Sequence, residues 1–129
     1  MFKRPLLIVL AFGLLTGVAT ASSFSLQGTY RTTITGKPAP LDGKWQLKFL
    51  SGNTVRTVRN GKLVIVAKAT RIGLRRLRFS DLSGSYACSR AEGNGIYTYR
   101  LASTRLTFRV VADKCIGRKL VLTTKPFVK

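Results

Sequence analysis

The chain has 129 residues, no histidine, and 23 lysines and arginines against four acidic residues, for a formal net charge of +19. Without histidine, the Ser-His-Asp and Cys-His arrangements of nucleophilic catalysis cannot be assembled, and the usual acid–base group near neutral pH is missing. So large a positive charge favours anionic partners and keeps a chain soluble, but it says little about the fold.

The first 21 residues have the three parts of a secretory signal peptide. Lys3 and Arg4 precede an apolar run over 5–15, and small residues follow as far as Ala21. The apolar run is shorter than the roughly 20 residues that a membrane span needs, and no second long apolar stretch follows. We therefore expect cleavage after Ala21, a single mature domain over 22–129 and no transmembrane helix. Removing Lys3 and Arg4 leaves 21 basic groups against four acidic ones, a net charge of +17.

From residue 22 onward, short runs with strand-like alternation are separated by Gly, Asn, Pro and Ser, and helical periodicity is almost absent. The clearest run is 44–49, where Trp45, Leu47 and Phe49 alternate with polar residues. This alternation predicts a strand with one buried and one solvent-exposed face. Asn60-Gly61 is the strongest turn signal, because both residues tolerate the positive φ of a two-residue hairpin turn. The predicted strands are 29–35, 44–49, 54–58, 63–70, 74–79, 96–101, 105–110 and 119–124.

Short connections between these runs predict antiparallel pairing of sequence neighbours, since parallel pairing needs crossovers of a dozen or more residues. Eight such strands, with no helix available to cover a sheet face, are best buried by closing into a barrel. We predict an all-β fold, an antiparallel up-and-down barrel of about eight strands. A two-sheet β-sandwich is the alternative.

Cys88 and Cys115 are the two cysteines, and an even number in an exported chain is most simply one disulfide. Closing a loop of about 28 residues would stabilise the domain by roughly 3 to 4 kcal/mol in the chain-entropy model. Metal binding is the weaker interpretation, because two thiolates without any histidine leave a zinc site two ligands short. We expect neither a metal nor a cofactor.

Several short motifs resemble those of lipocalin-like, or calycin, barrels. Gly-Thr-Tyr at 28–30 and Asp-Gly-Lys-Trp at 42–45 are similar to the Gly-x-aromatic entries of these folds. The segments 95–99, 106–108 and 113–118 resemble the C-terminal half of small secreted bacterial lipocalin-like proteins. The resemblance implies a bacterial, extracytoplasmic barrel in which the two cysteines bridge. It also implies that Arg118 lies over the Trp45 ring and closes the barrel base; a solvated Arg118 is the alternative.

The acidic residues Asp42, Asp81, Glu92 and Asp113 are the remaining candidates for catalysis, since a glycosidase needs two carboxylates. Asp42 and Asp81 stand in turn-like contexts, where aspartate commonly bonds its own backbone, and Asp113 lies among basic residues. We predict structural roles for them, with Asp113 and Arg118 paired at the end of the barrel beside the disulfide. The protein is therefore expected not to be an enzyme.

Aromatic residues on the predicted inward face favour ligand binding. An eight-stranded barrel is just wide enough to be filled by its own side chains or to hold one small ligand, and the sequence leaves both outcomes open. The polar groups of Trp and Tyr favour positions at a solvent-exposed entrance to the barrel, where they can form hydrogen bonds. We predict a secreted, non-catalytic protein that binds a small apolar or amphipathic molecule. The predicted ligand-binding residues are Tyr30, Trp45, Phe49, Tyr97, Tyr99 and Phe108.

Basic residues on the predicted outer face support an alternative function, that of an envelope-associated or adhesive protein. Such a protein would bind anionic polymers or lipid headgroups, whereas export argues against a specific nucleic-acid partner. The same residues could instead serve only to protect strand faces and edges from pairing with other chains. The predicted polyanion-binding residues are Lys44, Lys48, Arg75, Arg76 and Arg78.

Overall fold

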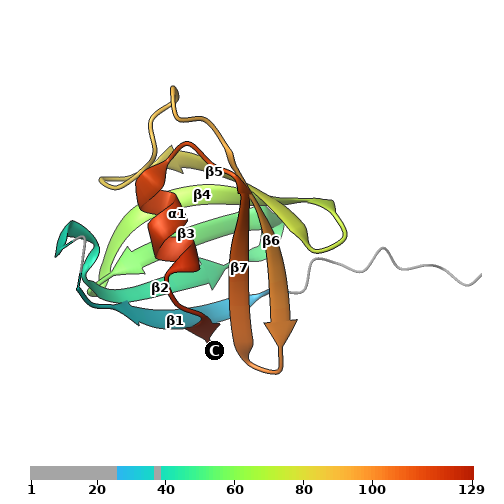
Figure 1. Ribbon diagram of the computed structural model, residues 1–129, viewed down its shortest axis with the longest axis horizontal. Helices are drawn as coiled ribbons and strands as arrows, with labels where there is room; N and C mark the ends of the chain where they lie inside the picture. Colours follow the sequence, from blue (N-terminus) through green and yellow to red (C-terminus); the bar gives the residue numbers. More distant parts are fainter. Residues whose placement is uncertain (1–25, 37–38) are drawn as a thin grey trace, which may run out of the picture.

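A computed structural model describes residues 26–36 and 39–129. The predicted signal peptide, 1–21, lies outside the described residues, as do residues 22–25 and 37–38. Eight strands form a closed antiparallel barrel in which each strand pairs with its sequence neighbours and the last returns to the first (Figure 1). The strands are β1 (Gly28–Ile34), β2 (Gly43–Phe49), β3 (Thr54–Arg59), β4 (Lys62–Gly73), β5 (Arg76–Ser83), β6 (Gly95–Ala102), β7 (Arg105–Ala112) and β8 (Phe127–Val128).

This architecture confirms the predicted up-and-down barrel and excludes the sandwich alternative. Two short 3-10 turns, Ala39–Leu41 and Ser51–Asn53, connect β1 to β2 and β2 to β3. Among residues 26–36 and 39–129, no helix is both long enough and apolar enough to cross a membrane.

Strand alternation places an apolar set inside the barrel. On β2, Trp45, Leu47 and Phe49 are buried, and the residues between them are not. On β7, the ring of Phe108 makes edge-to-face contacts with Tyr97 and Phe127. Burial of large rings in this geometry adds favourable aromatic contacts to the hydrophobic effect, so the centre of the barrel is a packed core.

The Asn60-Gly61 hairpin is confirmed. Both residues have positive φ, 49° and 80°, and they join β3 to β4 at the paired residues Arg59 and Lys62. The turn is also tied to β2, because the Lys44 backbone N–H donates to Asn60 Oδ1 at 2.9 Å and the Lys44 carbonyl accepts from the Asn60 N–H at 2.8 Å.

The predicted eighth strand, 119–124, is wrong. These residues lie in helix α1 (Ile116–Thr123) and its C-terminal cap, and the strand that closes the barrel is the two-residue β8. Arg118, Val121 and Leu122 are the buried residues of α1, at the i, i+3, i+4 spacing of one helix face. That face packs over the barrel interior, so the expectation that no helix covers the sheet was also wrong.

The start of the fifth predicted strand, 74–79, also differs. β4 continues to Gly73, and Leu74 and Arg75 form the turn to β5. Arg75 has a φ of 59°, a value that non-glycine residues seldom adopt. The turn signal was missed because neither residue is typical of a tight turn.

Candidate functional site

A disulfide joins Cys88, in the connection between β5 and β6, to Cys115, the residue that precedes α1. The predicted bridge is therefore present in the structure, and it is consistent with an extracytoplasmic compartment. The Cys88 backbone N–H also donates to Asp81 Oδ2 at 2.8 Å. These contacts hold the β5–β6 connection, which carries Tyr86, beside the start of the helix.

Arg118 lies at the centre of a buried polar network beside this disulfide. Its Nε donates to Asp113 Oδ2 at 2.7 Å, and its Nη2 donates to Asp113 Oδ1 at 2.8 Å and to the Gly93 carbonyl at 2.9 Å. The Tyr97 hydroxyl donates to Asp113 Oδ2 as well. The predicted pair of Asp113 and Arg118 is thus a bidentate ion pair, the strongest geometry for these two groups.

Asp81 is a second carboxylate in the network that the sequence did not indicate. Its Oδ1 lies 3.4 Å from Arg118 Nη1, and both side chains are almost fully buried. One guanidinium therefore faces two carboxylates, so the cluster of Arg118, Asp81 and Asp113 carries one net negative charge.

The pKa values in the network follow from burial and hydrogen bonding. Burial raises the pKa of the Asp113 carboxyl, but hydrogen bonds from Arg118, Tyr97 and the Cys115 backbone together bring it below its ordinary value. Burial lowers the pKa of the Arg118 guanidinium, and its interactions with Asp113 and Asp81 more than reverse this. Burial, followed by the hydrogen bond to Asp113, raises the pKa of Tyr97. At neutral pH the ion pair is thus charged and the phenol is neutral.

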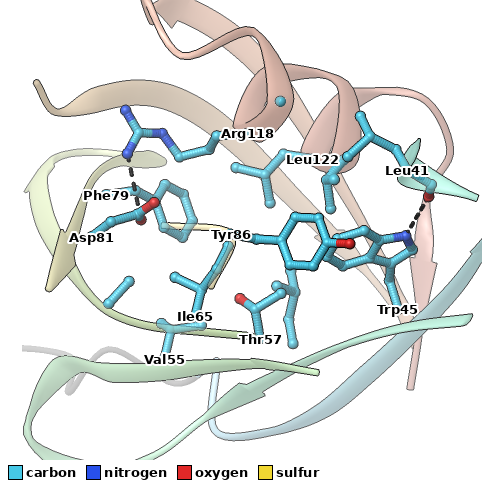
Figure 2. A pocket seen from close by; sticks show the side chains of 14 residues that line it. Leu41, Trp45, Val55, Thr57, Ile65, Phe79, Asp81, Tyr86, Arg118 and Leu122 are labelled. Atoms are coloured by element: carbon cyan, nitrogen blue, oxygen red, sulfur yellow. Dashed lines mark hydrogen bonds and ion pairs between the residues drawn. The ribbon is translucent and has the colours of Figure 1, made fainter. Parts of the chain in front are cut away.

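A cavity of about 70 Å³ lies between α1 and strands β2 to β5 (Figure 2). Its lining is mainly apolar and includes Trp45, Phe79 and Leu122. The cavity has about half the volume of an apolar cavity of about 150 Å³ that binds benzene. The barrel is therefore largely filled by its own side chains and keeps one small hollow beneath the helix.

Four polar side chains also border this cavity: Thr57, Asp81, Tyr86 and Arg118. Arg118 is 7% exposed, and its Nη1, which lies 3.4 Å from Asp81 Oδ1 in an ion pair, is buried without a hydrogen-bond partner among the described residues. A buried donor that makes no hydrogen bond costs on the order of 1 to 3 kcal/mol. The cavity therefore has an apolar body and, at one end, a donor that is still able to hydrogen-bond.

Tyr86 lies at the mouth of the cavity, since it lines the space and is still 40% exposed. The Arg59 guanidinium lies 5.5 Å from the Tyr86 ring centroid and 5.8 Å from that of Trp45, and Arg59 Nη1 donates to the Tyr86 hydroxyl at 2.8 Å. The cation over Trp45 is thus Arg59, and the expectation that Arg118 occupies this place was wrong, because the two aspartates hold Arg118 at the other end of the cavity.

Of the six aromatic residues predicted to bind a ligand, Trp45 alone borders the cavity. Its Nε1 donates to the Leu41 carbonyl at 2.7 Å, so the polar edge of the indole is already bonded. The others pack within the core or, for Tyr99, against it. These five aromatic residues are Tyr30, Phe49, Tyr97, Tyr99 and Phe108.

Sequence reasoning missed Thr57, Tyr86 and Leu122 as cavity residues. Tyr86 had one usable signal, because it stands two residues before a cysteine that was expected to bridge. Among the described residues, no cluster of three or more His, Cys, Asp or Glu side chains is placed to hold a metal ion.

The residues predicted to bind polyanions lie on the outside of the barrel. Lys44, Arg76 and Arg78 are exposed on β2 and β5, Lys48 is half-buried, and Arg75 is exposed in the β4–β5 turn. The structure therefore separates them into at least two surfaces, because β2 and β5 are not neighbours in the barrel.

The acidic residues do little to neutralise these surfaces. Asp81 and Asp113 are buried with Arg118, and Glu92 accepts a hydrogen bond from the Ser89 backbone at 2.8 Å. The positive charge of the outer surface is consequently left largely uncompensated.

Comparison of the chain with protein-family models, with curated proteins and with solved structures finds no significant match. The closed eight-stranded barrel is of the lipocalin-like type in its architecture.

Proposed function

We propose that this protein is a secreted bacterial member of the lipocalin-like class that binds a small amphipathic molecule without catalysis. The observation that carries the proposal is Arg118 Nη1, a buried donor that faces Asp81 Oδ1 at 3.4 Å but makes no hydrogen bond, at the polar end of a mainly apolar cavity. A ligand that supplies an acceptor at this point would recover the free energy of the missing hydrogen bond.

The cavity volume limits how much of the ligand is enclosed. About 70 Å³ accommodates only a few heavy atoms, so the polar end of the ligand enters while its apolar part lies along Trp45, Leu122 and the ring of Tyr86 at the mouth. Tyr86 belongs to a connection rather than to a strand, so its side chain is the one best placed to shift for a longer ligand.

The charge of the network selects the chemistry of the polar end. Arg118, Asp81 and Asp113 together carry one negative charge, so a carboxylate entering the cavity would be repelled in a region of low dielectric constant. A neutral hydroxyl or amide oxygen could accept from Arg118 Nη1, and its own hydrogen could be donated to Asp81 Oδ1. We therefore expect neutral amphiphiles to bind better than acids of the same length.

The absence of catalysis is supported by the way the carboxylates are used. Asp81 and Asp113 both contact Arg118, and each also accepts a backbone N–H, from Cys88 and Cys115. The two oxygens of Asp113 together accept from Arg118, Tyr97 and the Cys115 backbone, so this carboxylate is suited to a structural role, since a general base needs a free lone pair within reach of its substrate.

The experiment is a titration of the oxidised domain, residues 22–129, with octanol, octanamide and octanoate while Trp45 fluorescence is followed. We expect saturable binding of the alcohol and the amide that is unchanged by 0.5 M salt, and binding of the acid that is at least tenfold weaker. Ala67→Leu, which fills the cavity, should abolish binding, and Leu82→Ala, at an exposed position, should not. No binding of any of the three compounds by the folded domain would refute the proposal.

A further inference from the structure

We propose that the turn between β4 and β5, together with the adjoining part of β6, is a docking surface for an anionic lipid bilayer. We call this surface the docking patch and define it by Leu74, Arg75, Arg100 and Leu101. The inference goes beyond the proposed ligand binding and does not depend on it.

Leu74 is the first observation. It is 81% exposed, the largest exposed fraction among the large hydrophobic residues of the described chain, and it lies in a tight turn. Turns of this kind normally carry Gly, Asn or Asp, which tolerate the backbone geometry and prefer water. Arg75 beside it adopts a φ of 59° although it is not a glycine. Apolar exposure and backbone strain at the same turn point to a function, because neither stabilises the fold.

The second observation is that β6 adds the same two residue types at the same place. The Tyr99 backbone N–H donates to the Arg75 carbonyl at 2.9 Å, so the β4–β5 turn rests against β6. Leu74, Arg75, Arg100 and Leu101 line one depression, and no acidic side chain contributes to its lining. Leu101 is itself 38% exposed. Two leucines and two arginines from separate hairpins are therefore gathered on one surface.

This combination distinguishes a bilayer from a soluble polyanion. Arginines would attract either partner, because both carry negative charge. A soluble polymer offers nothing to Leu74, whereas a bilayer takes apolar side chains into its interface while arginine side chains reach the headgroups. Of these two partners, only the bilayer uses the exposed leucines, and the arginines favour a bilayer that is anionic.

The position of the docking patch is compatible with ligand binding at the other end of the barrel. The cavity is lined by Ile65 and Ala67 on β4, and Leu74 follows at the far end of the same strand. At about 3.3 Å per residue, the eight or so residues between them span roughly 25 Å. Figure 1 shows the β4–β5 turn on the side of the barrel away from α1. A domain docked through Leu74 would keep the mouth of the cavity in solution.

The test is co-sedimentation of residues 22–129, which contain the whole described barrel, with vesicles of phosphatidylcholine alone or mixed with phosphatidylglycerol. We expect binding to the mixed vesicles only. Leu74→Ser should weaken it at least tenfold, and Arg75→Asn, which keeps a residue that tolerates positive φ, should weaken it about fivefold. The matched controls are Leu82→Ser, at a position 58% exposed, and Lys62→Asn, in the β3–β4 hairpin; neither should change binding more than twofold.

A second measurement reports insertion directly. Tryptophan emission of Leu74→Trp should shift to shorter wavelength when phosphatidylglycerol vesicles are added, and that of Leu82→Trp should not. Unchanged binding of Leu74→Ser, or equal losses in Leu74→Ser and Leu82→Ser, would overturn the proposal. Heparin, a soluble polyanion, provides a further test. If the protein binds heparin as tightly as it binds vesicles, and Leu74→Ser does not change either affinity, the bilayer proposal is overturned in favour of a purely electrostatic surface.

Discussion

At Arg118, one guanidinium joins three separate segments of the chain. It contacts Gly93 in the connection before β6, Asp113 at the end of β7 and Asp81 on β5, while its own backbone belongs to α1. A buried ion pair of this kind contributes little when both partners are present, but removal of one partner leaves an uncompensated charge. The network therefore determines where α1 lies more than how stable the barrel is.

Acid should destabilise the protein through Asp113. Its carboxyl has a lowered pKa in the folded state, so the stability it contributes is fully present above the ordinary aspartate pKa of about 3.9 and is lost as the pH falls through the folded value. We expect the urea midpoint to be constant between pH 7 and 5 and to fall below about pH 4. Asp113→Asn should be less stable than the native protein at pH 7, and its urea midpoint should fall less steeply as the pH is lowered below about 4. An identical acid profile in Asp113→Asn would contradict the assignment.

Gly95 is required by the same network. A Cβ at this position would lie 2.8 Å from Arg118 Nε and closer still to the Asp113 carboxylate. We expect Gly95→Ala to lower the free energy of unfolding by about 1 to 3 kcal/mol, as overpacking does. Gly117→Ala is the control, because its Cβ would meet nothing within 4 Å and alanine favours the helix by up to about 1 kcal/mol. Urea unfolding of both variants measures the difference, and equal stabilities would show that the network adjusts freely.

At the scale of elements, the disulfide and α1 act as a unit that closes one end of the barrel. Cys115 immediately precedes the helix, and the bond to Cys88 ties that end to the connection carrying Tyr86. The helix is only eight residues long, too short to be stable without its packing and its covalent tie.

Removal of the disulfide should therefore affect both stability and the cavity. For a closed loop of about 28 residues, the chain-entropy model gives a loss of about 3.5 kcal/mol in the double variant Cys88→Ala, Cys115→Ala. We expect the thermal midpoint of this variant to fall and its Trp45 side chain to become more accessible to a fluorescence quencher. Reductant should lower the midpoint of the native protein and leave that of the variant unchanged. A response of both proteins to reductant would show that another effect is being measured.

At the scale of the whole molecule, the basic residues repel one another across the sheet. Lys48 on β2 lies directly opposite Arg56 on β3, and like charges at such positions destabilise a strand pair. The four acidic residues are too few to offset 23 basic ones. The surface charge therefore opposes folding, and this repulsion is a cost that other interactions in the barrel offset.

Salt should consequently stabilise the folded protein. We expect the thermal midpoint to rise when sodium chloride is increased from 20 mM to 500 mM, because screening weakens repulsion between exposed charges. Lys48→Glu should raise the free energy of unfolding by about 0.5 to 1 kcal/mol at low salt and by less at high salt. A midpoint independent of salt in both proteins would contradict this account.

Much of the barrel could be predicted because strand alternation and turn chemistry are local. Seven strands were placed within a few residues of their observed positions, and Asn60-Gly61 adopts its expected φ values, since each depends only on neighbouring residues. The error at 119–124 has a local cause as well. A short apolar run fits a strand and a helix equally, and only packing of Val121 and Leu122 over the open barrel selects the helix.

Residue type, periodicity and number were enough to predict the barrel class, the positive charge and the disulfide, and they indicated the pairing of Asp113 with Arg118. They could not show which inward residues border a cavity, because that depends on how α1 and the strands pack together. Tyr97 and Trp45 are both buried and both inward, yet Tyr97 packs against other rings and Trp45 faces the hollow beneath α1. The tertiary structure also placed Asp81 beside Arg118, and it placed Leu74 and Leu101 on one surface. Neither could be predicted, because contacts between segments far apart in the sequence depend on how the whole barrel closes.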